Sequence, residues 1–119
     1  MILVDTSVWI DHLRSGNPQL VRRLDGADVL AHPFVIGELA LGSLRNRKEI
    51  IALLQALPRA TVATDAEVLR LIEQERLHGA GIGYVDAALL AATRLTPDAA
   101  LWTRDRRLSA AAGRLRVGR

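Results

Sequence analysis

The sequence predicts an α/β protein in which helices cover both faces of a central parallel sheet. Short apolar runs typical of buried strands alternate along the chain with longer segments of helical composition. Parallel strands need crossover connections, which helices usually supply. Two of the apolar runs end at a small polar group that contains an aspartate, Asp5 in one case and Asp105 in the other. Open parallel sheets bind ligands at this carboxyl end of the strands, so the pattern also predicts where a site lies.

The beginning of the chain indicates two strands with a helix between them. Residues 1–4 are apolar and rich in branched side chains, and the chain turns small and polar at residues 5–7. This is typical of a buried strand that runs into a loop or the start of a helix. Residues 17–26 begin with Asn-Pro and end in glycine, which are start and stop signals of an amphipathic helix. Residues 28–31 then form a second short strand.

The middle of the chain is predicted to be mostly helical. Residues 33–44 are apolar apart from one glutamate and one serine, and their length and their Leu and Ala content favour a buried helix. A further helix covers about residues 47–56 and ends before a proline. Residues 60–63 are a strand candidate. The sequence that follows, Thr-Asp-Ala-Glu, has the spacing of a capping box and opens a helix over residues 64–78.

The last third of the chain repeats the alternation of helix and strand. The glycines of residues 79–83 make this the most flexible stretch, and it leads into an Ala/Leu-rich helix over residues 84–94 that stops before a proline. Residues 99–103 are another strand candidate. A short helix over about residues 107–112 and a last strand around residues 115–117 complete the prediction.

Composition predicts one folded domain over residues 1–119. Half of the residues are hydrophobic and 24% are charged, which is a globular balance and not that of a disordered chain. The sequence has no cysteine, which excludes disulfides, thiol nucleophiles and thiolate metal sites. We expect no signal peptide and no membrane span, because no apolar run is long enough. A cytoplasmic protein that does not contact a membrane is the resulting expectation.

The chain is basic, with a formal net charge of +3 and an isoelectric point of about 10.5. This charge suits a polyanionic partner, but a genome that favours Arg and Ala codons would produce the same bias. Six arginines lie in the last sixteen positions beside one acid, Asp105. Arginine suits bidentate contact with phosphate, while a solvated and frayed tail explains the final arginines equally well.

Four acidic residues stand in apolar surroundings, unlike the other acids, which lie in mixed polar segments. They are Asp5, Glu38, Asp86 and Asp105. Burying an isolated carboxylate is costly unless a partner or a metal compensates its charge. The four together predict one shared cation site. Magnesium, with manganese able to substitute, fits these hard oxygen ligands better than zinc, because cysteine is absent and the histidines show no ligand spacing.

Three hydroxyl side chains are expected to support this metal site, Thr6, Ser7 and Thr103. They stand next to Asp5 and Asp105 at the ends of the two strand candidates. Hydroxyl groups at these positions can hold metal-bound waters or orient the carboxylates. Carboxylates that hold magnesium with several waters can orient and activate a water and stabilise the charge that develops on a phosphodiester.

Each acid also has a simpler explanation when it is considered alone. Asp5 can be the N-cap of a following helix, and Asp86 can complement a helix dipole, and each of these is an even alternative. For Asp105 in isolation, capping or an ion pair with a neighbouring arginine such as Arg104 is the favoured explanation. Glu38 is the hardest to explain locally, because it interrupts an apolar helical stretch. The metal hypothesis therefore rests on the set of four.

Other site classes find no support in the sequence. A phosphate-binding GxxxxGK[ST] motif is absent, and the glycines of residues 79–83 follow a helix and not a strand, so they lack a dinucleotide-binding context. Ser7 has no partner histidine at a known spacing, which argues against a serine nucleophile.

At the same residues the chain resembles the PIN-domain ribonucleases and, among them, the VapC toxins of bacterial and archaeal toxin–antitoxin pairs. Four segments look like family motifs and follow the family order: MILVDTSVWIDHLR, HPFVIGELALGSL, GIGYVDAALLAA and LWTRDRRL. The resemblance carries over Asp5, Glu38, Asp86 and Asp105 as the acidic magnesium site, with Thr6 or Ser7 and Thr103 in support. Many PIN domains continue the last motif with another acid and an aromatic, whereas Arg107 and Leu108 stand here. A fifth carboxylate and a firmly held second metal are therefore not implied.

The resemblance implies further properties that composition does not. They are a three-layer α/β/α sandwich, a homodimer, single-stranded or structured RNA as substrate, and a cognate VapB-type antitoxin that blocks the acidic site. Transfer RNA and ribosomal RNA are the leading substrates in that family. Two other classes of protein compete with this interpretation. One is a non-catalytic module for RNA or protein binding, and the other is a phosphotransfer domain of the haloacid-dehalogenase type, although the latter usually shows D-x-D where this chain has Asp5-Thr6-Ser7.

Overall fold

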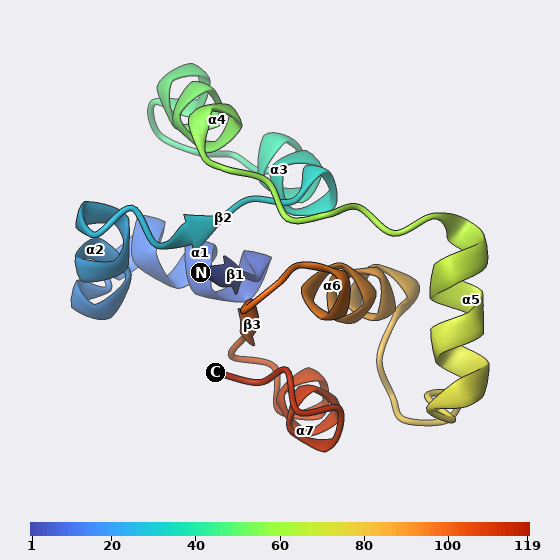
Figure 1. The fold of residues 1–119 in the computed structure, drawn as a ribbon. Coiled ribbons are helices and arrows are strands. Elements are labelled where there is room, and N and C mark those ends of the chain that lie inside the picture. The colour runs from blue at the N-terminus through green and yellow to red at the C-terminus, as the bar shows by residue number, and fades with distance from the viewer.

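A computed structural model describes residues 1–119, and a parallel sheet of three strands lies at its centre, in the order β2-β1-β3 (Figure 1). The strands are β1 (Ile2–Val4), β2 (Val29–Leu30) and β3 (Ala100–Trp102). Ile2 of β1 pairs with Val29 on one side and with Ala100 on the other. The strands are apolar, as expected where a parallel sheet is covered on both faces. The parallel sheet expected from the sequence is confirmed.

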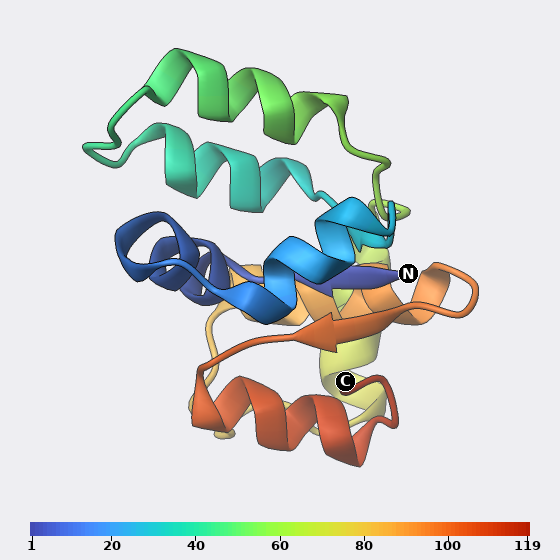
Figure 2. The same cartoon turned by 90° about the vertical axis from the view of Figure 1, so that its left-hand side faces the viewer.

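Seven helices complete the chain. They are α1 (Thr6–Ser15), α2 (Pro18–Asp25), α3 (Pro33–Ala40), α4 (Arg47–Ala56), α5 (Asp65–Gln74), α6 (Tyr84–Leu95) and α7 (Arg106–Arg114). In both ribbon views, α2 lies on one side of the sheet and α6, backed by α5, lies on the other (Figures 1 and 2). The pair α3 and α4 lies beyond β2, and α7 lies beyond β3. This is the α/β/α sandwich that the resemblance implied.

Two of the expected helix starts form as the sequence indicates. Asn17 accepts a hydrogen bond from the backbone N–H of Leu20 and caps α2. At α5, Thr64 accepts from the N–H of Glu67, and the Glu67 carboxylate accepts from the N–H of Thr64. This reciprocal arrangement is the predicted capping box, and it satisfies backbone donors that a helix start leaves unpaired.

The two outer strands predicted from sequence are reduced to single bridges. Arg59, and not the segment 60–63, pairs with Ala31 beside β2, and Gly118, just beyond the segment 115–117, pairs with Leu101 beside β3. Beyond Arg59 the chain turns away from the sheet, and the N–H of Thr61 donates to a side-chain oxygen in place of a strand. Apolar, branched composition alone does not show how many residues of a segment pair with a neighbouring strand.

Two helices end earlier than predicted. The helix expected to reach residue 44 ends at Ala40, whose carbonyl accepts a hydrogen bond from the Arg47 side chain at 2.8 Å. The helix expected to reach residue 78 ends at Gln74, because Arg76 adopts a left-handed backbone conformation with φ 51° that a helix cannot continue through.

The core is aliphatic, as the shortage of aromatic residues predicts. A single cluster of 29 buried hydrophobic residues spans the sheet and the helices on both of its sides. The two tryptophans, Trp9 and Trp102, are buried in it and act as packing residues. None of the helices combines the length and the apolar character that crossing a bilayer requires.

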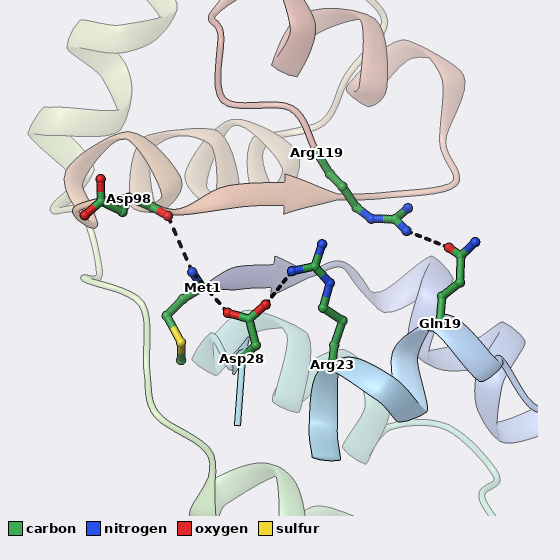
Figure 3. Close-up of polar contacts among 6 residues, drawn as sticks. All are labelled: Met1, Gln19, Arg23, Asp28, Asp98 and Arg119. Atoms are coloured by element: carbon green, nitrogen blue, oxygen red, sulfur yellow. Dashed lines mark hydrogen bonds and ion pairs between the residues drawn. The ribbon is translucent and has the colours of Figure 1, made fainter. Parts of the chain in front are cut away.

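Two groups of polar contacts join distant parts of the chain (Figure 3), and one of them lies at the amino ends of β1 and β2. The ammonium group of Met1 lies 3.3 Å from a carboxylate oxygen of Asp28, and Arg23 forms an ion pair with the same carboxylate. Arg119 donates to the side-chain oxygen of Gln19 and lies over the ring of Trp102, with 3.9 Å between the guanidinium carbon and the ring centroid. The last arginine is therefore held in place and is not frayed.

Candidate active site

The opposite edge of the sheet, at the carboxyl ends of the strands, brings four helix ends together. Figure 2 shows the starts of α1, α6 and α7 and the last turn of α3 at this edge. The four acids singled out in the sequence belong to these ends. Asp5 is the N-cap of α1, Glu38 lies in the last turn of α3, Asp86 lies in the first turn of α6, and Asp105 is the N-cap of α7.

Asp5 is the central residue of this edge, and its side chain is only 7% exposed. One of its oxygens accepts from the N–H of Thr6 at 2.7 Å, and the other accepts from the hydroxyls of Ser7 at 2.9 Å and Thr103 at 2.7 Å. Its own N–H donates to the carbonyl of Trp102, which ties the end of β1 to the end of β3. These donors stabilise a carboxylate that would otherwise be costly to bury.

The two hydroxyl groups extend the network toward α7. Ser7 and Thr103 lie 3.4 Å apart, but each has a single proton, which it donates to Asp5. Their remaining lone pairs accept from the backbone, Ser7 from the N–H of Arg104 and Thr103 from the N–H of Asp105, both at 3.0 Å. The supporting hydroxyls predicted from sequence therefore do lie beside Asp5, and they fix the backbone that carries Asp105.

Glu38 is connected to the same network through Thr6. The Thr6 hydroxyl donates to one carboxylate oxygen of Glu38 at 2.6 Å, and this contact joins α1 to α3. Glu38 is exposed, so the apolar surroundings in its sequence do not bury it. Its other oxygen accepts no hydrogen bond and remains available to a ligand.

Asp86 is half-buried at the start of α6, where one of its oxygens accepts from the N–H of Gly83 at 3.0 Å. Burial raises the pKa of its carboxyl group above the usual range, and the negative charges of Asp5 and Asp105 raise this pKa further, while the hydrogen bond from Gly83 opposes the shift. Three of the four acids are thus close enough to interact through their charges.

Asp105 caps α7 by accepting from the N–H of Leu108 at 2.9 Å. The capping explanations weighed for Asp5 and Asp105 are therefore confirmed, and both residues also face the shared edge. The neighbouring Arg104 forms its ion pair with Asp11 of α1 and not with Asp105.

Asp11 and Arg104 are two residues of this region that the sequence analysis did not select. The ion pair between their side chains adds to the backbone contact from Arg104 to Ser7, so that α1 is joined twice to the loop before Asp105. Ser7 and Asp11 are four residues apart in one helix, a spacing that places them on the same face. That spacing was the available signal, but nothing in the sequence indicated that Arg104 lies opposite.

The donor set suits a hard cation such as magnesium, although no three His, Asp or Glu side chains form a ready-made cluster for a metal. Every candidate ligand is an oxygen, and Asp86 and Asp105 each keep one oxygen without a hydrogen bond. After burial, the negative charges of Asp5 and Asp105 also raise the pKa of Asp86, and a cation would compensate this repulsion. Magnesium commonly retains several waters and needs only one or two direct carboxylate ligands, so the residues present fit it.

Comparison with known proteins identifies the family. The PIN domain family matches residues 2–114, so the chain belongs to the PIN domain family, as its motifs indicated.

Within that family the chain is similar to the VapC group. It is 52% identical over 111 residues to the protein named ribonuclease VapC32 from Mycobacterium tuberculosis, in strain H37Rv and equally in strain CDC 1551. The matched region covers 93% of this chain and 90% of that protein. No solved structure matches the chain.

Proposed function

We propose that this chain is the toxin of a VapBC-type toxin–antitoxin pair and acts as a magnesium-dependent endoribonuclease. The proposal is supported by its membership of the PIN domain family and by 52% identity to a protein named as a VapC ribonuclease. The site assignment is supported by the hydrogen-bond network at this edge, in which Thr103 joins Asp5 to the N–H of Asp105 and Thr6 joins Asp5 to Glu38. Negative charge gathered at a sheet edge is costly unless the protein uses it to hold a cation.

In this proposal Asp5, Glu38, Asp86 and Asp105 hold magnesium, for which manganese can substitute. The bound ion would lower the pKa of a coordinated water and stabilise charge on the phosphate. Hydrolysis joins the water oxygen to phosphorus and breaks one phosphorus–oxygen ester bond, and the released ribose oxygen takes up a proton.

The hydroxyl residues position the acids. Ser7 and Thr103 hold the Asp5 carboxylate in one orientation, Thr103 also fixes the N–H of Asp105, and Thr6 holds Glu38. Fixed carboxylates need no reorganisation when charge develops in the transition state, which is the condition for large electrostatic stabilisation.

The test is cleavage of RNA by purified protein with magnesium, with manganese and with a chelator. We expect cleavage with either metal and none with the chelator. Asp105→Asn should lower the rate by about 10² or more, since such metal and electrostatic contributions amount to several kcal/mol. Asp25→Asn is the matched control, because Asp25 is exposed at the end of α2 and forms no hydrogen bond through its side chain. Cleavage that persists undiminished in the chelator refutes the metal mechanism.

A VapB-type antitoxin that covers the acidic edge is the partner that follows from this function. A basic side chain inserted among the carboxylates would compensate their repulsion and compete with the metal. Binding of the antitoxin encoded beside this chain should weaken sharply in an Asp86→Ala, Asp105→Ala double variant. Unchanged affinity would place the inhibitor elsewhere. A homodimer belongs to the same proposal, and sedimentation of the purified protein tests it.

A further inference from the structure

A hollow of about 460 Å³ lies between the loop that follows α5 and the outer face of α7, and its charged lining is entirely basic. The titratable residues that line it are Arg76, His78, Arg107 and Arg114, and no acid is among the lining residues. Elsewhere on the surface, the hollow between α5 and α6 mixes Glu67 with arginines. A hollow beside α1 and α4 is also lined by arginines without an acid, Arg14 and Arg45, but the basic hollow brings three arginines and a histidine together.

The arginines of the basic hollow have no carboxylate partner. The ion pairs of the structure involve Arg23, Arg94 and Arg104, and none of these lines the hollow. Three positive side chains that face one space without a counter-ion repel one another, unless an anion occupies the space between them. The hollow thus has the electrostatic character of an anion-binding site.

The face of α7 that lines the hollow has a regular composition. Arg107, Ala110, Ala111 and Arg114 follow one another at helical spacing, so that two arginines flank two alanines on one face. The small alanines leave room between the arginines, which are separated by about 10 Å along the helix. That length corresponds to about three nucleotides at the rise of about 3.4 Å that stacked nucleic acid shows per step.

Arg107 is held against the glycine-rich loop that leads to Asp86. A Cβ atom added at Gly81 would lie 2.7 Å from atoms at the end of the Arg107 side chain, so this side chain packs directly over the glycine. The φ of 79° at Gly81 favours glycine. Two residues further on, the N–H of Gly83 holds the Asp86 carboxylate. The same loop therefore contacts one residue of the basic hollow and holds one residue of the acidic edge.

We propose that the basic hollow binds phosphates of the RNA a few nucleotides away from the bond that is cut. The proposal rests on the nuclease function argued above and adds a substrate-binding site to it. An acidic edge repels the RNA backbone, so the enzyme needs cationic contacts beside it. Arg107 and Arg114 lie on the helix that Asp105 caps, and their guanidinium groups suit bidentate contact with phosphate oxygens.

The test compares an Arg107→Gln, Arg114→Gln double variant with an Arg14→Gln, Arg22→Gln double variant of equal charge. Arg14 and Arg22 are exposed on α1 and α2, away from the basic hollow. Both pairs are introduced into the Asp86→Asn protein in the presence of a chelator, so that bound RNA is not cut. The readout is the fluorescence anisotropy of a labelled single-stranded 20-mer (~20 nucleotides, enough to span the ~10 Å face) over a series of salt concentrations.

We expect the Arg107/Arg114 variant to bind the RNA about tenfold more weakly at low salt. The slope of log affinity against log salt should become shallower by about 1.4, since each of the two lost single-strand phosphate contacts contributes about 0.7. The control should change little. In the active protein, the Arg107/Arg114 variant should raise KM for the same RNA while kcat is retained. An Arg107→Lys, Arg114→Lys variant, which keeps the charge, should recover most of the salt dependence.

The proposal is overturned if the Arg107/Arg114 variant binds RNA as the parent does, or if the control variant weakens binding equally, because a general charge effect would then explain the result. It is also overturned if the Arg107/Arg114 variant binds RNA as the parent does but binds a Glu-rich peptide more weakly, since the hollow would then serve an acidic protein. Because binding is measured on uncut RNA, its outcome is independent of whether the chain cleaves RNA. Melting curves of all variants verify that they remain folded.

Discussion

Replacing Asp86 by asparagine removes one charge from the acidic edge and nearly preserves the shape of the side chain. We expect the metal-free variant to be at least as stable as the parent and to have lost RNA cleavage. The carboxyl pKa of Asp86 is raised in the folded state, first by burial and then by Asp5 and Asp105. A raised carboxyl pKa means that the folded state holds this proton more tightly than the unfolded state. Ionised Asp86 therefore costs stability once the pH exceeds its unfolded pKa, and asparagine removes that cost at neutral pH.

The opposing contribution can be estimated from the position of Asp86 at the start of α6. A negative charge in the first turn of a helix stabilises by about 0.3–1 kcal/mol, and the variant loses this. The hydrogen bond from the N–H of Gly83 is retained, because the asparagine oxygen accepts it in place of the carboxylate. A purely structural role for Asp86 thus predicts a lower melting temperature by about 1–4 °C, at about 4 °C per kcal/mol for a domain of this size. If the charge of Asp86 instead carries a cost of burial and repulsion, its removal predicts no decrease in the melting temperature.

Thermal melts in chelator and in magnesium distinguish these outcomes. A ligand that binds only the folded state, at a hundredfold excess over its dissociation constant, adds about 2.7 kcal/mol to the free energy of unfolding, which raises the melting temperature by about 10 °C here. Magnesium should raise the melting temperature of Asp86→Asn much less. Asp65→Asn is the matched control. Asp65 also stands in the first turn of a helix, α5, and it accepts a hydrogen bond from Tyr84, but it is exposed and is not among the charges that raise the pKa of Asp86. A variant at Asp86 that melts several degrees below the parent in chelator, yet still cuts RNA, would refute the reasoning.

Three further predictions concern the scaffold of the site and its stability. Thr103→Val removes a donor to the buried Asp5 and should destabilise the protein by about 1–3 kcal/mol in denaturant titrations and slow cleavage as well; equal stability would contradict the network. His32 is 1% exposed, and burial, aided by the positive charge of Arg59, lowers the pKa of its side chain below 6.5. The stability of the folded protein should therefore fall as the pH drops below about 6.5. His32→Asn keeps an acceptor for the N–H of Phe34, and its melting temperature should fall less than that of the parent between pH 7 and 5. Thr64→Ala removes the cap of α5 and should cost about 0.5–2 kcal/mol in the same titration, while cleavage remains at the parental rate.

The parts of the fold that local chemistry determines could be predicted from the sequence. Apolar runs located all three strands, and the cap residues Asn17 and Thr64 marked the starts of two helices. The outer strands could not be predicted, because they depend on a partner from a distant part of the chain, and the end of α5 could not, because no glycine or proline marks Gln74 as the last residue. Arg59 pairs with a single residue, Ala31, just beyond β2, and composition carries no information about the length of such a pairing.

The site could be predicted only as a set of residue types. Isolation in apolar sequence identified the four acids, and proximity to strand ends identified Thr6, Ser7 and Thr103. The hydrogen bond from the Thr103 hydroxyl to the Asp5 carboxylate, at the centre of the candidate site, joins residues 98 positions apart. The Asp11–Arg104 ion pair is equally non-local. No period or cap signal encodes such contacts, so the sequence cannot predict which hydroxyl donates to which carboxylate.

The capping role and the proposed metal role of these acids support each other. A carboxylate has about four lone-pair positions, and capping uses only some of them, so that Asp86 and Asp105 each keep an oxygen without a hydrogen bond. The starts of α1, α6 and α7 meet at this edge, and the positive end of each helix dipole stabilises negative charge there. The fold therefore compensates part of the repulsion among the acids before any metal binds. The compensation is incomplete, because the charges of Asp5 and Asp105 still add to the increase in the Asp86 pKa that burial causes. Under the proposed function, a cation at this edge would compensate the repulsion that the helix dipoles leave.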